Sequence, residues 1–340
     1  MLFPALEHYL ARLQETTLPK ATSSEQSDDA ELMSRNPANR VWLDSDGRVQ
    51  GTYFNTTLTS VFQPIRQIAV SREDVNSPTS TDSIDISEAH KDTHKIVGYE
   101  GFAHSYSPND NGLYLWKLLD HAASDDESIE LDRLCRMLHS INFYRQSKEG
   151  SEAEQSPQNA DLYLSVHARL LAAVDSNHGM AFRRILRLLG LPHENIVLQL
   201  PTITSTQSWL LNYVLDNYRR NQFRLAVNAD TVAQAHGLLE RVRPDVLKID
   251  GRGLINDAET QRLLEITQKR GIRVIFKRLE KLRDFESVQK LAEQSFVLTG
   301  ARIAGQGFFW DRPQASLGVF SASVRVNQSA MASPSQQAPL

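Results

Sequence analysis

The chain has 340 residues, of which 41% are hydrophobic and 23% charged, as is typical of a soluble globular protein. Its formal net charge of −4 and pI near 6.2 give no global attraction to nucleic acid or an anionic membrane, although a local basic patch would be hidden in that average. A single cysteine, Cys135, excludes an intrachain disulfide and a cysteine-based zinc cluster.

The N-terminal segment has the pattern of a short amphipathic helix, predicted over residues 1–15. Phe3, Leu6, Leu10 and Leu13 recur at three- and four-residue steps. We expect this apolar stripe to dock onto the rest of the chain, with a homodimer or partner contact as the alternative. The chain begins without a basic and apolar signal sequence, and no stretch is apolar enough to span a bilayer, so we expect a cytoplasmic protein.

Residues 16–45 are rich in Ser, Asp, Glu and Gln, which predicts a flexible polar linker. Residues 319–340 have little to bury and predict a disordered tail. Two further polar stretches, residues 71–94 and 145–161, have the composition of loop insertions.

Residues 46–318 alternate short apolar runs with helical patterns, which predicts an α/β fold. About eight strands joined by helical crossovers favour parallel pairing in a (β/α)8 TIM-like barrel. The candidate strands are Val61 to Ile65, Ile96 to Phe102, Leu162 to Val166, Ile196 to Leu200, Arg224 to Val227, Val246 to Ile249, Val274 to Phe276 and Ala301 to Phe308.

The last residues of barrel strands project into one shared mouth, so they are the candidate site residues. A phosphodiesterase that uses two divalent cations needs several carboxylates there, because hard cations prefer charged oxygen ligands. The ring expected here is poor in carboxylates: it contains Glu100, Ser165, Gln199, Asn228, Asp250, Lys277 with Glu280, and Gln306.

Several short motifs occur in the order and spacing of an EAL domain, over roughly Thr57 to Arg312. They are Gln63-Pro64-Ile65, Gly98-Tyr99-Glu100, Leu131-Asp132-Arg133-Leu134-Cys135, Lys248-Ile249-Asp250 and Gly305-Gln306-Gly307-Phe308-Phe309. The chain thus resembles a family of (β/α)8 barrels that hydrolyse cyclic di-GMP. The resemblance implies ligand-contacting roles for Gln63 and Gln306, a metal-binding role for Glu100, and the catalytic lysine motif at Lys248 and Asp250.

The chain departs from the family pattern at most of the acidic positions. Gln199 and Asn228 stand where the family has metal-binding carboxylates, and Lys277 replaces the first glutamate of the seventh strand, whereas Glu280 keeps the second. His104 replaces an arginine that meets a ligand phosphate. Amides keep the shape but lose the charge, and an ammonium group repels a cation, so we expect neither a metal nor another cofactor.

We therefore expect a degenerate EAL barrel without catalysis, which regulates cyclic di-GMP-related signalling through contact with a protein partner. The alternatives are a metal-free receptor for cyclic di-GMP and a weak phosphodiesterase. If a ligand binds, the candidate residues are Gln63, Glu100, His104, Lys248, Asp250, Lys277, Glu280 and Gln306.

Two structural alternatives apply to single residues of this set. Lys277 could instead form a salt bridge with Glu100 or Glu280. His104, placed at the start of a loop, could be a surface or packing histidine.

Overall fold

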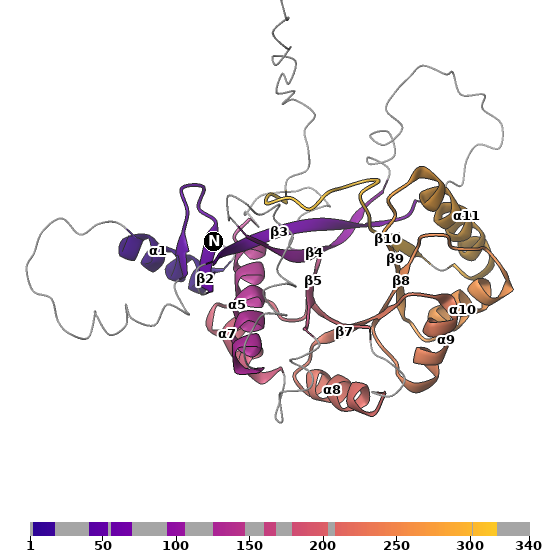
Figure 1. Cartoon of the computed structure of the whole chain (residues 1–340), viewed down its shortest axis with the longest axis horizontal. Helices are drawn as coiled ribbons and strands as arrows, with labels where there is room; N and C mark the ends of the chain where they lie inside the picture. Colours follow the sequence, from indigo (N-terminus) through magenta and orange to yellow (C-terminus); the bar gives the residue numbers. More distant parts are fainter. Residues whose placement is uncertain are drawn as a thin grey trace, which may run out of the picture.

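The computed structural model describes residues 3–17, 41–53, 56–69, 94–105, 125–146, 160–167, 179–202, 208–300 and 302–317 (Figure 1). Most of the expected linker, most of the two expected insertions and the expected tail lie outside these residues. Within them, no helix combines the length and the apolar character needed to cross a bilayer.

Eight strands of the described chain close into a barrel, which confirms the predicted α/β fold. Their order around the ring is β3-β10-β9-β8-β7-β6-β5-β4, and β4 pairs with β3 to complete it. The strands are β3 (Thr56–Gln67), β4 (Ile96–Ser105), β5 (Asp161–Ser165), β6 (Ile196–Leu200), β7 (Arg224–Ala229), β8 (Val246–Asp250), β9 (Arg273–Lys277) and β10 (Ile303–Gly305).

One strand runs against the others, where the sequence had predicted parallel pairing. β3 is antiparallel to both of its neighbours in the ring, β4 and β10, whereas the remaining barrel strands pair in parallel. The prediction assumed a helical crossover after every strand, which a parallel pair requires and an antiparallel pair does not. β3 and β4 are also longer than predicted, and His104 lies within β4 rather than at a loop start.

In the described part of the chain six helices surround the barrel, and Figure 1 shows α8 to α11 on the outside of the ring. They are α5 (Asp125–Tyr144), α7 (Met180–Leu188), α8 (Ser208–Arg220), α9 (Val232–Arg241), α10 (Ala258–Lys269) and α11 (Leu282–Thr299). Their ends carry recognisable signals: the side chains of Thr231 and Asp257 accept from backbone N–H groups in the first turns of α9 and α10. Gly300, with φ of 70°, ends α11 in the left-handed conformation.

The N-terminal part packs against the barrel. α1 (Pro4–Thr17) buries Leu6, and Phe3 lies edge-on to Tyr144 at the end of α5, with ring centroids 5.3 Å apart. Two short strands, β1 (Val41–Leu43) and β2 (Val49–Tyr53), form a hairpin whose second strand pairs with β3. β1 lies inside the expected 16–45 linker, so that boundary was wrong: three residues are too few to show a strand period.

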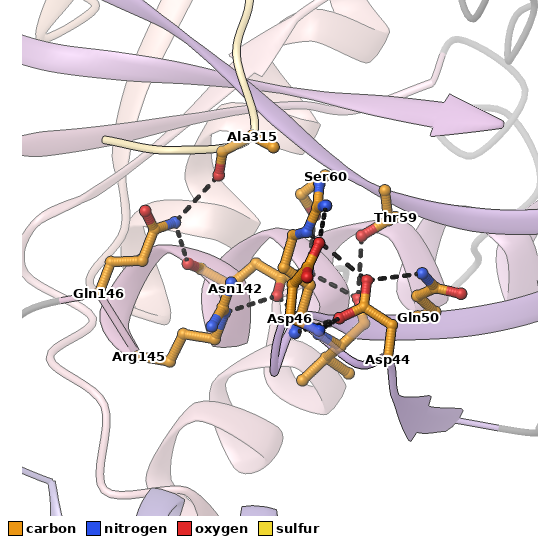
Figure 2. Close-up of polar contacts among 11 residues, drawn as sticks. Asp44, Asp46, Gln50, Thr59, Ser60, Asn142, Arg145, Gln146 and Ala315 are labelled. Carbon is orange, nitrogen blue, oxygen red and sulfur yellow. Dashed lines mark hydrogen bonds and ion pairs between the residues drawn. The ribbon is translucent and has the colours of Figure 1, made fainter. Parts of the chain in front are cut away.

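The hairpin is fastened to α5 by Asn142 (Figure 2). Its Oδ1 accepts from the Val49 backbone N–H at 2.8 Å and its Nδ2 donates to the Val49 carbonyl at 2.7 Å. Arg145 also donates to Oδ1, and Nδ2 reaches Ser60 Oγ at 3.4 Å. Asn142 and Val49 are both buried, so this one amide satisfies backbone groups that water does not reach.

Replacing Asn142 with Ala is expected to destabilise the fold by about 1–3 kcal/mol, because the buried Val49 N–H loses its acceptor, while the Val49 carbonyl keeps the Thr59 hydroxyl as a donor at 3.1 Å. Urea unfolding at neutral pH measures the loss. The matched control is Asn256→Ala, which removes an exposed amide from the outer surface. A loss no larger than that of the control would contradict this role of Asn142.

Candidate functional site

The barrel mouth contains a layer of four polar side chains from alternate strands. Glu100 is on β4, Gln199 on β6, Lys248 on β8 and Gln306 directly after β10. In a (β/α)8 barrel, alternate strands supply the four residues of one interior layer. We call these four residues the polar layer. Beneath it the interior is apolar, formed by Ile65, Tyr163, Val197, Ala226, Val246, Ile275 and Ala304.

Lys248 is the centre of the polar layer. Its Nζ donates to Glu100 Oε2 at 2.7 Å, Gln199 Oε1 at 2.6 Å and Gln306 Oε1 at 2.9 Å. An ammonium group has three N–H donors, so all of them are used. The side chain is only 2% exposed, and Nζ lies 5.5 Å from the centre of the Tyr163 ring below.

Glu100 receives hydrogen bonds from the other three members of the layer. Besides Lys248, Gln199 Nε2 donates to its Oε1 at 2.8 Å and Gln306 Nε2 to its Oε2 at 2.7 Å. Burial alone would raise the pKa of Glu100, but the charge of Lys248 and the three hydrogen bonds outweigh burial and lower it. The carboxylate is therefore ionised and neutralised by Lys248.

Neighbouring groups extend the polar layer to either side. Gln306 Nε2 also donates to Gln63 Oε1 at 3.0 Å, and Gln63 donates to the Asp311 carbonyl at 2.8 Å. Gln199 Nε2 reaches Ser165 Oγ at 3.3 Å. The structure thus brings Gln63, Glu100, Lys248 and Gln306 of the candidate set together, and it holds them mainly by bonds to one another.

Lys277 makes a separate contact at the end of β9. Its Nζ donates to Asn228 Oδ1 at 2.9 Å, and Asn228 donates to the Leu200 carbonyl. Burial, followed by the nearby charge of Arg278, lowers the pKa of Lys277. The alternative of a salt bridge with Glu100 or Glu280 is not realised: Lys277 binds Asn228, Glu100 binds Lys248, and Glu280 is exposed.

Asp250 lies outside the polar layer, two residues beyond Lys248 at the end of β8. Arg252 and Arg278 both bind its Oδ2, at 2.7 and 2.9 Å. Burial would raise the pKa of Asp250, but these hydrogen bonds lower it to about 2. With Asp230, the three residues line a hollow of about 600 Å³.

Sequence reasoning assigned no role to the two arginines beside Asp250. Arg252 follows Asp250 by two residues, a spacing that could have revealed the contact. Arg278 comes from the next strand and has a left-handed backbone (φ 62°), which no local pattern signals. The remaining candidate, His104, is on β4 four residues beyond Glu100 and opposite Thr59 of β3.

A divalent metal does not fit this set of donors. Among the described residues, no three His, Cys, Asp or Glu side chains lie close enough together to hold an ion. Glu100 is already paired with Lys248, and Gln199, Asn228 and Lys277 bring no negative charge to the mouth. Hard cations are held by several charged oxygens, which this mouth does not offer.

The barrel, with its one antiparallel strand, matches several solved structures. The fold is that of an EAL domain. BlrP1 of Klebsiella pneumoniae, solved with manganese and cyclic di-GMP, superposes with a TM-score of 0.52 at 17% identity, over 76% of this chain and 56% of that one. A standalone EAL protein of Vibrio cholerae, bound to cyclic di-GMP, gives 0.52 at 14% identity over 77% and 94%.

The EAL domain of FimX from Pseudomonas aeruginosa, bound to cyclic di-GMP, gives a TM-score of 0.51 at 14% identity over 76% of this chain and 91% of that one. This chain spans less than two thirds of BlrP1 and of the EAL enzyme Bd1971. No protein-family model and no curated protein matches the sequence. At these identities the likeness concerns the fold alone.

Replacing Lys248 with Met is expected to destabilise the protein by about 3–5 kcal/mol, because Glu100 would stay buried without a compensating charge. The double variant Glu100→Gln with Lys248→Met is expected to recover much of the loss, since it removes both charges. Denaturant unfolding of both variants measures the coupling. Lys290→Met, on the outer surface of α11, is the control. Equal destabilisation by the single and double variants would contradict the pairing argument.

Proposed function

We propose that this protein is a catalytically inactive EAL-like regulator in cyclic di-GMP-related signalling, and that it acts through contact with another protein. The observation that carries the first part is the buried bond between Lys248 and Glu100. It places an ammonium group on the mouth carboxylate, with amides at Gln199 and Gln306 around it. These bonds satisfy the polar layer internally, and a metal ion would have to break them.

The hydrolytic alternative is tested directly by incubating the full chain with cyclic di-GMP and magnesium or manganese. We expect no linear dinucleotide above the protein-free background, because the mouth offers too few charged oxygens to hold a metal. Chromatography of the nucleotides measures the product. Product that requires the metal and disappears with chelator would overturn the proposed inactivity.

A gain-of-binding variant tests the physical cause. Gln199→Glu, Asn228→Asp and Lys277→Glu together add three carboxylates and remove one ammonium group from the mouth. In chelator we expect a lower melting temperature, because the new carboxylate at position 199 faces Glu100. With manganese we expect the melting temperature to rise. The control, with Gln268→Glu, Asn212→Asp and Lys290→Glu, makes the same charge change at exposed positions on three different outer helices and is expected to show no manganese response.

The second part of the proposal, contact with a protein, is supported by an exposed apolar surface formed by α11 and the segment before α10. Val297 and Leu298 are 81% and 68% exposed, and they line a groove of about 660 Å³. Ile255, which is 69% exposed, precedes the groove residues Asn256 and Asp257. Exposed apolar residues that gather at a groove are typical of a protein interface.

Replacing Val297 and Leu298 with Glu is expected to abolish copurification of the partner from the native cell, because the apolar contact would be lost. Affinity purification with quantitative mass spectrometry compares this variant with the unmodified chain. Leu282→Glu, at another exposed apolar position of α11, is the control. A partner retained by the Val297 and Leu298 variant would exclude this surface.

A metal-free receptor for cyclic di-GMP is the second candidate function. It is favoured by Arg252 and Arg278, whose guanidinium groups line the 600 Å³ hollow close to Lys277 and are suited to phosphate oxygens. Calorimetric titration with cyclic di-GMP in chelator tests it. A receptor would bind at micromolar or lower concentration and lose affinity in Arg252→Ala and Arg278→Ala. No heat at high nucleotide concentration would exclude it.

A further inference from the structure

The end of the barrel opposite the mouth is rich in arginine. Helices run against the strands, so α8, α9 and α10 end where β7, β8 and β9 begin. Arg219, Arg243 and Arg270 lie at these helix ends, where they line a hollow of about 330 Å³ together with Pro244, Asp245 and Gly271. The chain's net charge of −4 conceals this local concentration of positive charge.

These three arginines are held in position by backbone carbonyl groups. Arg219 donates to the carbonyl of Arg243, Arg243 to that of Arg270 at 2.9 Å, and Arg270 to that of Leu239. The carbonyls of Leu239 and Arg270 lie at helix C-termini, where carbonyl groups carry partial negative charge, whereas the Arg243 carbonyl belongs to the extended segment after α9. A guanidinium has five N–H donors, so each retains donors for an external anion.

Helix α7 continues this basic surface. Arg183 donates to Gln222 Oε1 at 2.8 Å, and the Gln222 backbone N–H donates to the carbonyl of Arg219. The hydrogen bonds therefore connect α7 to the end of α8 and to the first arginine of the hollow. We call the set Arg183, Arg184, Arg187, Arg219, Arg243 and Arg270 the basic surface.

The exposed face of α7 carries both arginines and apolar side chains. Met180, Arg184, Arg187 and Leu188 lie at i, i+4, i+7 and i+8, so they share one helix face. Met180 is 58% and Leu188 70% exposed, and both arginines are exposed as well. The opposite face is buried through Phe182 and Leu186.

We propose that the basic surface attaches the protein to the anionic phospholipid headgroups of a membrane. The arginines would bind headgroup phosphates, and Met180 and Leu188 would enter the boundary between headgroups and acyl chains. Basic residues beside exposed apolar residues on one helix face are the pattern of interfacial helices. A phosphate backbone of nucleic acid offers no comparable place for these two apolar side chains, which is why we favour the membrane.

Cosedimentation of the full chain with vesicles tests this proposal. We expect binding to vesicles of equal parts phosphatidylserine and phosphatidylcholine, loss of binding at high salt, and none to phosphatidylcholine alone. Arg184→Glu with Arg187→Glu should weaken binding by roughly 30-fold or more. Met180→Ser with Leu188→Ser should weaken it by roughly tenfold. Arg283→Glu with Lys290→Glu makes the same charge change on α11 and should have no effect.

Three results would overturn the proposal: no binding to the anionic vesicles, equal losses in the control, or no loss in either α7 variant. Circular dichroism and thermal melting verify that each variant is folded. A duplex oligonucleotide is tested in parallel at the same salt concentration. Duplex binding that depends on Arg184 and Arg187 but not on Met180 and Leu188, without vesicle binding, would assign the surface to nucleic acid instead.

Discussion

One buried charge pair, Lys248 with Glu100, organises the barrel mouth. Either charge alone would be costly in this interior, and together they need the amides of Gln199 and Gln306 to satisfy the remaining donors and acceptors. The four residues come from alternate strands, so the hydrogen bonds connect parts of the ring that do not pair with each other. The charge pair thus fixes the chemistry of the mouth and also contributes to its shape.

Because the four side chains of the polar layer hydrogen-bond to one another, the mouth differs from a site whose ligands are free to coordinate a metal. The solved EAL structures compared above were obtained with cyclic di-GMP bound, and one of them with manganese. Here the donors and acceptors of the polar layer bind one another. The hollow in the mouth lies beside this layer, at Asp250 and its two arginines. Exposed apolar side chains and exposed arginines lie instead on outer surfaces of the molecule. The proposed contacts with a protein and with a membrane accordingly lie on these outer surfaces.

The position of a residue along a predicted strand indicates whether its side chain reaches the mouth. Glu100 and Gln306 were expected in the mouth from their strand positions, and Gln63 and Lys248 were candidates from the resemblance; the structure brings the four together. The partner of Lys277 could not be predicted, because several polar side chains lie within reach and the barrel's geometry chooses among them. Lys277 binds Asn228, which is on β7, the strand next but one to β9.

The hairpin and the direction of β3 were missed for related reasons. The first strand of the hairpin, β1, has only three residues, too few to show a strand pattern, and the antiparallel course of β3 depends on a pairing that no local segment encodes. Arg219, Arg243 and Arg270 were likewise unremarkable in the sequence, because each lies at the end of a different helix. Only folding gathers them around one hollow.

The antiparallel strand β3 also affects how the chain folds during synthesis. Its two neighbours in the ring are β4, which follows it in sequence, and β10, the last strand described. During synthesis the ribosome therefore releases β3 and β4 long before the strand that completes the ring. Contacts between segments so distant in sequence form slowly. Until β10 emerges, one edge of β3 has backbone groups without their final partners, and this is when the nascent chain is most exposed to aggregation.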